Sequence, residues 1–119
     1  EVVVGPVSGQ KVPYDTARDF APITLVGETP LAIVAHPSVA AKDIGELIAA
    51  AKAEPSKYSY ATPGGGSTMH FAGESLKALA GIFIVHIPYR GAAPAVADLL
   101  GGQVELGIVG AEVDEEIVD

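Results

Sequence analysis

The residues best suited to chemistry lie in one glycine-rich stretch, Tyr60-Ala-Thr-Pro-Gly-Gly-Gly-Ser-Thr-Met-His70. Glycines carry no Cβ, so a ligand oxygen can approach their backbone closely. Ser67 is a natural N-cap for a helix that follows, and the first N–H groups of a helix lack partners within it. Such a helix start attracts anions, with a dipole contribution of about 0.3–1 kcal/mol. The stretch therefore predicts an anion-binding loop, to which Ser67 and Thr68 add hydroxyls and His70 an imidazole.

Sharper phosphate and hydrolase motifs fail at this stretch. A Walker-type phosphate loop needs Lys before the Ser or Thr, and Gly66 stands there. A dinucleotide fingerprint and a nucleophile elbow both need glycine at position 69, which is Met69. The simplest alternative is a capped turn that binds nothing.

A second polar stretch is Ile87-Pro-Tyr-Arg-Gly-Ala-Ala-Pro94. The Arg90 guanidinium can pair bidentately with a carboxylate, and Tyr89 can wall the carboxylate or hydrogen-bond to it. Arg90 can equally be a solvated loop charge or a partner of Asp98.

Catalytic and metal readings are weaker. Ser67 and His70 could serve a small hydrolase or phosphate-ester enzyme, but they sit three residues apart on one helix start and no orienting acid is evident. His36, His70 and His86 lack metal-ligand spacing, so we expect no metal and no cofactor, and a structural role for His36 and His86. We therefore expect a binding protein and not an enzyme.

The elements that must position these residues alternate along the chain. Apolar runs predict strands at 31–35, 58–61, 82–87 and 104–109, and helical periodicity predicts helices starting near 44, at 68–80 and near 94. Asp43 or Ser38 would cap the first helix, and Gly81 would end the second, whose expected inner face is Phe71, Ala72, Leu76, Leu79 and Ala80. Residues 1–5 could form another strand and residues 13–20 a turn or short helix.

This alternation predicts the α/β fold class: a three-layer domain with a parallel sheet of about four strands and helices covering it. Ligands of open α/β sheets gather beyond the carboxyl ends of the strands. Because both polar stretches follow strands of the same direction, we expect them at the same edge of the sheet.

Composition narrows the partners. The 119 residues carry 15 acidic and 7 basic side chains, a formal charge of −8, with no basic stripe for nucleic acid. The chain has no Cys, so disulfides and thiolate metal sites are excluded. No apolar run approaches the roughly 20 residues that span a bilayer. The stretch that opens on Glu1 does not have the basic, apolar and small-residue pattern of a signal peptide.

These motifs, in this order, resemble the substrate-binding proteins of tripartite tricarboxylate transporters, the Bug family. The resemblance spans most of residues 13–107. Its most specific parts are the stretch 60–70 followed by Ala72-Gly73-Glu74, and His86-Ile-Pro-Tyr-Arg-Gly91. It also includes Pro13-Tyr-Asp15, Asp19-Phe-Ala-Pro22, Pro37-Ser38, Glu46-Leu47, Ala93-Pro94, Asp98-Leu99 and Gly101-Gly-Gln103.

The resemblance implies one lobe of a periplasmic binding protein that holds a small organic acid and delivers it to membrane permease components. Carried over by position, the ligand-binding residues would be Thr62, Gly64, Gly65, Gly66, Ser67, Thr68 and His70, with Tyr89, Arg90 and Gly91 nearby.

Relative to the family, the chain is short. Residues 1–22 would be a remnant of the first lobe and the crossover, residues 23–109 the ligand-binding lobe, and residues 110–119 an acidic tail. The opposing loop of the first lobe is absent, so a half-site would bind more weakly. A further alternative is a non-binding association module that self-associates through an exposed lobe interface.

Overall fold

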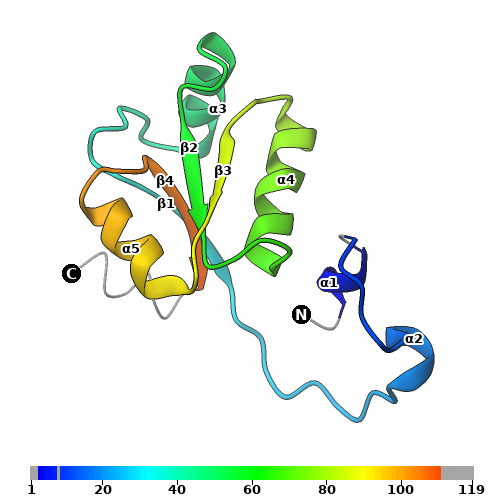
Figure 1. Cartoon of the computed structure of the whole chain (residues 1–119). Coiled ribbons are helices and arrows are strands. Elements are labelled where there is room, and N and C mark those ends of the chain that lie inside the picture. The colour runs from blue at the N-terminus through cyan, green and yellow to red at the C-terminus, as the bar shows by residue number, and fades with distance from the viewer. Residues whose placement is uncertain (1–2, 8, 111–119) are drawn as a thin grey trace.

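The computed structural model describes residues 3–7 and 9–110. In chain order the elements are α1 (Val4–Val7), α2 (Thr16–Asp19), β1 (Leu31–Ala35), α3 (Ile44–Ala53), β2 (Ser59–Thr62), α4 (Thr68–Ala80), β3 (Val85–Pro88), α5 (Ala92–Leu100) and β4 (Leu106–Gly110) (Figure 1).

One four-stranded sheet, in the order β1-β4-β2-β3, forms the centre of the fold. β4, β2 and β3 run parallel, as the sequence predicts. β1 departs from the fully parallel sheet, because it lies antiparallel to β4, with Leu31 opposite Gly110 and Ala35 opposite Leu106. An antiparallel strand at the edge of a parallel sheet is common in large α/β folds, and a strand–helix–strand pattern does not determine its direction.

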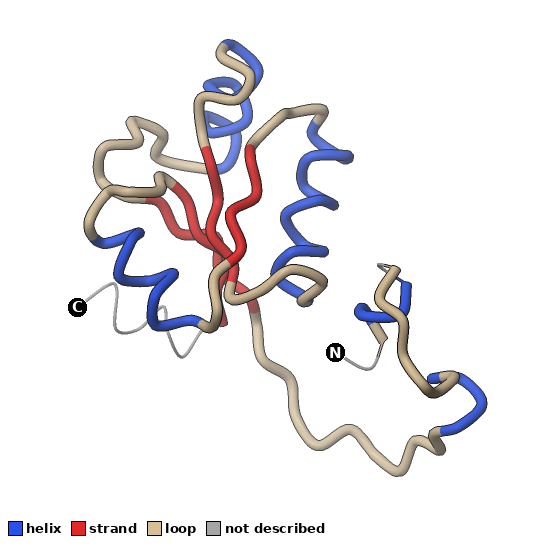
Figure 2. Tube along the Cα trace, in the orientation of Figure 1, coloured by secondary structure: helices blue, strands red, loops and turns tan. Residues whose placement is uncertain are grey.

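Helices α3, α4 and α5 cover the sheet on both faces, which confirms the predicted three-layer α/β architecture. α3 and α4 pack on the face that carries Tyr60 and Ile108, and α5 packs on the face that carries Ala61 and Val104 (Figures 1 and 2). β4 is buried along its whole length. Its Gly107 leaves room for the Leu99 side chain of α5, which would stand 3.0 Å from a Cβ at that position.

Local signals set the helix ends as expected. The Asp43 carboxylate, not Ser38, caps α3 by accepting from Glu46 N at 2.8 Å. Ser67 caps α4 by accepting from His70 N at 3.2 Å, and Gly81 ends α4 in the left-handed conformation at φ 67°. α4 spans the predicted residues 68–80, and α2 is the short helix expected within 13–20.

Three sequence expectations are wrong in detail. Phe71 and Leu79 do not belong to the inner face of α4, because Leu79 is 89% exposed and Phe71 is exposed as well. The predicted Ala72, Leu76 and Ala80 do pack inward, together with Met69. The third strand begins at Val85 and not at residue 82, because only from Val85 onward does the chain pair with β2. The strand considered for residues 1–5 overlaps α1, and the part at residues 1–2 lies outside the described residues.

The N-terminal part of the chain lies apart from the sheet. Residues 20–30 run as an extended segment from α2 to β1, with Ile23 and Val26 almost fully exposed (Figure 2). Within residues 3–7 and 9–110, no helix has both the length and the apolar character needed to cross a membrane.

Candidate functional site

The two polar stretches meet at one edge of the sheet, as predicted. The glycine loop (residues 63–67) follows β2 and leads into α4, and the arginine loop (residues 89–91) follows β3 and leads into α5. Tyr89 N donates to Thr62 O at 2.9 Å, and Gly91 N donates to Pro63 O at 2.9 Å. These two backbone bonds continue the β2–β3 ladder beyond the strands, so the loops lie side by side at the carboxyl ends of both strands.

Hydroxyl groups hold the glycine loop from inside. Thr62, which is fully buried, donates through Oγ1 to Gly64 O at 3.1 Å. Ser67 Oγ donates to the same carbonyl at 2.7 Å while capping α4. The Gly64 carbonyl is therefore turned inward, whereas Gly65 and Thr68 lie on the exposed side of the loop.

One of the predicted receptor amides is already engaged. Gly66 N donates to His70 Nδ1 at 3.0 Å, and Gly66 adopts φ 74°, a left-handed conformation that favours glycine. The His70 amide itself is taken by the Ser67 cap. An anion at this loop would therefore meet the outer side around Gly65, Ser67 and Thr68, and not the amides of Gly66 and His70.

The floor of the loop is a cluster of aromatic and charged side chains. The His70 and His86 rings stack with centroids 3.8 Å apart and an interplanar angle of 10°, and the Tyr60 ring lies 5.0 Å from His86. His86 Nε2 lies 2.6 Å from Thr62 Oγ1. Tyr60 donates to Glu74 Oε1 at 2.6 Å. His86 therefore contacts His70, Tyr60 and Thr62, as expected for a structural residue, and lies next to the predicted site.

Lys77 and the backbone of α4 complete this cluster. Lys77 Nζ donates to Glu74 Oε1 at 3.1 Å, and His70 Nε2 lies 3.8 Å from the same oxygen. Sequence reasoning did not assign functional importance to Tyr60, Glu74 or Lys77. The sequence did contain a signal for Tyr60, because residues 60 and 62 of one strand point to the same face of the sheet, so Tyr60 shares the face of the predicted site residue Thr62.

The surroundings set the ionisation of this cluster. Partial burial opposes ionisation of Glu74, but the hydrogen bonds from Tyr60 and Lys77 outweigh it and lower the pKa of its carboxyl. Burial lowers the pKa of His86, and the neighbouring His70 adds to that effect. Burial and the Glu74 carboxylate raise the pKa of the Tyr60 phenol. At neutral pH the cluster therefore holds an ionised Glu74 beside a neutral His86 and a neutral phenol.

Gly73 makes the contact between α4 and Tyr60 possible. A Cβ at Gly73 would overlap the Tyr60 ring and stand 2.7 Å from its hydroxyl oxygen. Gly73 and Tyr60 are both buried, and Tyr60 is among the largest fully buried side chains of the fold. The glycine lets the helix approach closely enough for Tyr60 to reach Glu74.

In the arginine loop the three predicted residues have different surroundings. The Tyr89 hydroxyl donates to Asp98 Oδ2 at 2.7 Å, so Asp98 is bound by Tyr89. Arg90 is exposed, and no ion pair to it is formed within the described part of the chain. Gly91 precedes α5 at φ 111°, where a side chain would strain the backbone.

The geometry gives the hydrolase alternative little support. Ser67 Oγ is used by Gly64 O and His70 N, and the His70 Nδ1 atom faces Gly66 N. No hydrogen bond joins the Ser67 hydroxyl to the imidazole among the contacts of residues 3–7 and 9–110. The same residues contain no group of three His, Cys, Asp or Glu side chains placed to hold a metal ion.

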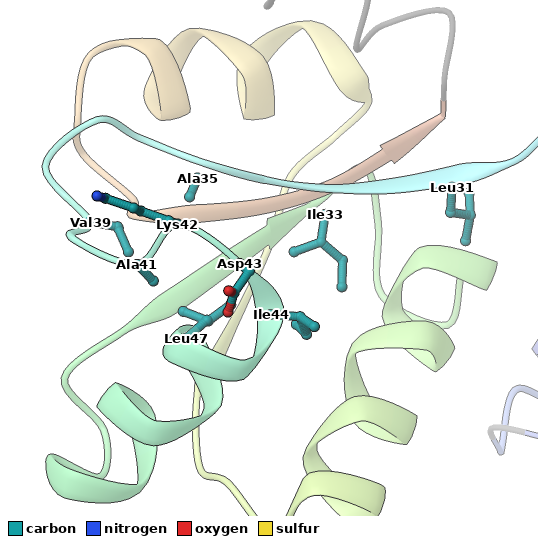
Figure 3. Close-up of a pocket in the computed structure, with 9 residues that line it drawn as sticks. All are labelled: Leu31, Ile33, Ala35, Val39, Ala41, Lys42, Asp43, Ile44 and Leu47. Carbon is teal, nitrogen blue, oxygen red and sulfur yellow. The ribbon is translucent and has the colours of Figure 1, made fainter.

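A hollow lies away from the two loops, between β1 and the start of α3 (Figure 3). It measures about 410 Å³ and is lined mostly by apolar side chains. Of its two charged residues, Lys42 and Asp43, the second is the cap of α3. None of the predicted site residues lines it. Because its lining is mostly apolar, this hollow offers few groups that could recognise a polar ligand. We therefore consider the two loops to be the better candidate for a binding site. The lining residues are Leu31, Ile33, Ala35, Val39, Ala41, Lys42, Asp43, Ile44 and Leu47.

An α/β lobe with two adjoining polar loops at the carboxyl edge of its parallel strands has the form of a solute-binding lobe. Comparison with known proteins makes this specific. The family described as "Tripartite tricarboxylate transporter family receptor" (TctC) matches residues 1–115. The chain belongs to this family, which confirms the resemblance drawn from the sequence.

Relatives with sequences and structures agree. Protein BugT of Bordetella pertussis (strain Tohama I) is 38% identical over 97 residues, covering 82% of this chain and 30% of BugT. The solved "Structure of a periplasmic transporter" superimposes with a TM-score of 0.81 at 39% identity, covering 92% of this chain and 37% of the other. "R. palustris Rpa4515 with adipate" gives a TM-score of 0.72 at 33% identity, covering 82% and 32%.

The chain thus spans about a third of the length of the relatives that it matches. Other solved structures that it matches are described as a TctC solute binding protein from Polaromonas and as the periplasmic binding protein BugD. The partial coverage is consistent with a single lobe.

Proposed function

We propose that the glycine loop and the arginine loop form one wall of a binding site for a small organic carboxylate. The observation that carries this proposal is the pair of backbone bonds that join Tyr89 to Thr62 and Gly91 to Pro63, which hold the two loops together at the start of α4. The helix start offers donors to an anion, and the exposed Arg90 offers a positive charge next to it. The similarity to the structure of R. palustris Rpa4515 with adipate supports a dicarboxylate.

The ten predicted residues would contribute in different ways. Gly65, Ser67 and Thr68 would face the ligand from the start of α4, and Arg90 would pair with a carboxylate oxygen. Tyr89 would wall the site while its hydroxyl holds Asp98. The remaining members, which shape the loops from within, are Thr62, Gly64, Gly66, His70 and Gly91.

In the whole protein, we propose, this lobe would work in the periplasm and deliver the acid to the membrane permease of a tripartite tricarboxylate-type transporter. Membership of the receptor family supports this role. Residues 1–22 would belong to the first lobe and the crossover, residues 23–109 to the binding lobe, and residues 110–119 to an acidic tail.

Isothermal titration calorimetry with a panel of mono-, di- and tricarboxylates, adipate included, tests the binding proposal. We expect heat from at least one dicarboxylate at low salt and weaker binding at moderate salt, because exposed charges are screened. Absence of binding by every acid up to millimolar concentration would refute a carboxylate site in this chain.

Gly65→Leu is the informative variant. A Cβ at Gly65 meets nothing within 4 Å and φ is not in the left-handed region, so the side chain should block the loop without disturbing the fold. Gly27→Leu is the matched control, because Gly27 has equally open surroundings in the extended segment, which contains none of the predicted site residues. Gly65→Leu should lose binding at least tenfold and Gly27→Leu should keep it; equal affinities would place the ligand elsewhere.

A further inference from the structure

The imidazole of His70 lies between the glycine loop and the sheet rather than on the outer side of the loop. It stacks on His86 of β3, and only 29% of its side chain is exposed. Its Nδ1 atom accepts the Gly66 N–H at 3.0 Å. The contact reaches from the first turn of α4 back to the residue before the helix cap, so it closes the loop onto the helix.

This contact defines the protonation of the ring. Because Gly66 N donates, Nδ1 must carry no proton, and the proton of the neutral imidazole is on Nε2. Nε2 is directed at Glu74 Oε1, 3.8 Å away. That carboxylate is fixed in turn by Tyr60 at 2.6 Å and Lys77 at 3.1 Å.

We propose that His70 is a positioning residue, a latch that holds the glycine loop in its binding shape while the imidazole is neutral and releases it when the imidazole is protonated. Protonation places an N–H on Nδ1 that points at the Gly66 N–H. Two donors then face each other, and the loop loses the bond that fixes Gly66. The effect of the latch on carboxylate affinity rests on the function proposed above, whereas the latch itself does not.

The charged and titratable groups around His70 come from three elements of the fold. Glu74 and Lys77 face it from α4, His86 from β3, and the Tyr60 phenol and Thr62 hydroxyl belong to β2 next to them. Glu74 remains ionised over the range in which imidazoles ordinarily titrate, and it favours a proton on Nε2. Burial and the neighbouring His70 lower the pKa of His86, which opposes a second positive charge in the stack.

Amide hydrogen exchange measured by NMR on the full chain, without any ligand, tests the latch. We expect the protection factor of the Gly66 amide to fall at least tenfold between pH 8 and pH 5. His70→Asn places a non-titrating oxygen near the position of Nδ1, so Gly66 should stay protected at both pH values. His70→Gln places its amide near Nε2 instead, so Gly66 should be unprotected at both.

Controls separate the latch from a general loss of structure. His36→Asn changes a histidine that bonds to Ser38 away from the loop, and it should leave the Gly66 profile as in the wild type. Circular dichroism and urea midpoints report whether each variant folds. Wild-type protection of Gly66 in a folded His70→Gln variant, or a pH-independent Gly66 amide in the wild type, would overturn the proposal.

Adipate titrations at pH 8 and pH 6 then link the latch to binding. We expect the affinity of the wild type to fall several-fold more than that of His70→Asn, since the protonation of adipate itself affects both equally. An exchange profile as expected with no binding of any acid would uphold the latch and reject the binding proposal. Binding of an acid without the expected exchange profile would uphold the binding proposal and reject the latch.

Discussion

The contact of Gly73 with Tyr60 gives a prediction whose magnitude follows from the structure. In Gly73→Ala, the new Cβ would overlap the Tyr60 ring, and Tyr60 is 1% exposed and has no open space to enter. Overpacking a well-packed core costs about 1–3 kcal/mol. Losing the hydrogen bond from Tyr60 to the Glu74 carboxylate adds up to about 1.5–3 kcal/mol, the usual range for a bond to a charged group.

Helix propensity acts in the opposite direction. Alanine in a helix interior is more favourable than glycine by about 0.5–1 kcal/mol. Because Glu74 is partly exposed, water replaces some of the lost hydrogen bond, and we expect a net destabilisation of about 2–3 kcal/mol, the size of a typical damaging core substitution. In a domain of this size that corresponds to a melting temperature lower by about 8–15 °C.

Urea unfolding followed by circular dichroism measures this loss. Ala78→Gly, on the exposed side of the same helix, calibrates the propensity and should destabilise by about 0.5–1 kcal/mol. If the ring is the cause, Gly73→Ala should cost at least about 1 kcal/mol less in a Tyr60→Leu background, as a double-mutant cycle would report. A Gly73→Ala protein as stable as the wild type would refute the close approach of α4 to Tyr60.

Two further predictions concern Gly91, which precedes α5, and the stability of the chain in acid. Gly91→Ala should destabilise the chain by about 1–3 kcal/mol, because φ at Gly91 is 111° and a side chain there strains the backbone. Thermal unfolding measures this loss, and an unchanged melting temperature would contradict the prediction. Partial burial opposes ionisation of Glu105, but hydrogen bonds from Ser59 N at 3.0 Å and Ser59 Oγ at 2.9 Å outweigh it and lower the pKa of Glu105. The stability that Glu105 contributes is therefore complete above the unfolded-state pKa of about 4.3 and is lost as the pH falls through the lower folded-state pKa. Urea midpoints measured from pH 7 to pH 3 should fall less steeply in Glu105→Gln, and parallel curves would contradict this assignment.

The helix ends were the most predictable part of the fold, because their signals are local. Ser67 and Gly81 bound α4 at the residues expected from the sequence alone. The strands were less predictable: Ile82 and Ile84 are buried like strand residues, yet they precede the ladder, whose start depends on the pairing of Ser59 with Val85. The residue at which a strand begins to pair depends on contacts with residues distant in the sequence, so it cannot be deduced from a local pattern.

The candidate site likewise has some features that the sequence predicts and others that it does not. The two loops and their common edge follow from the order of strands and helices, so the sequence predicts them. The stacking of His70 on His86 joins residues from two elements, and the engagement of Gly66 by His70 depends on the left-handed turn at Gly66. Neither contact follows from spacing, and together they place the His70 imidazole against Gly66 and His86.

The antiparallel pairing of β1 with β4 has a mechanical consequence. Leu31 lies opposite Gly110, so β1 begins and β4 ends at the same edge of the sheet, where β2 and β3 also end. A body attached through residue 30 or residue 110 would pivot close to the two loops, so even a small rotation would change how far a guest at that edge is enclosed.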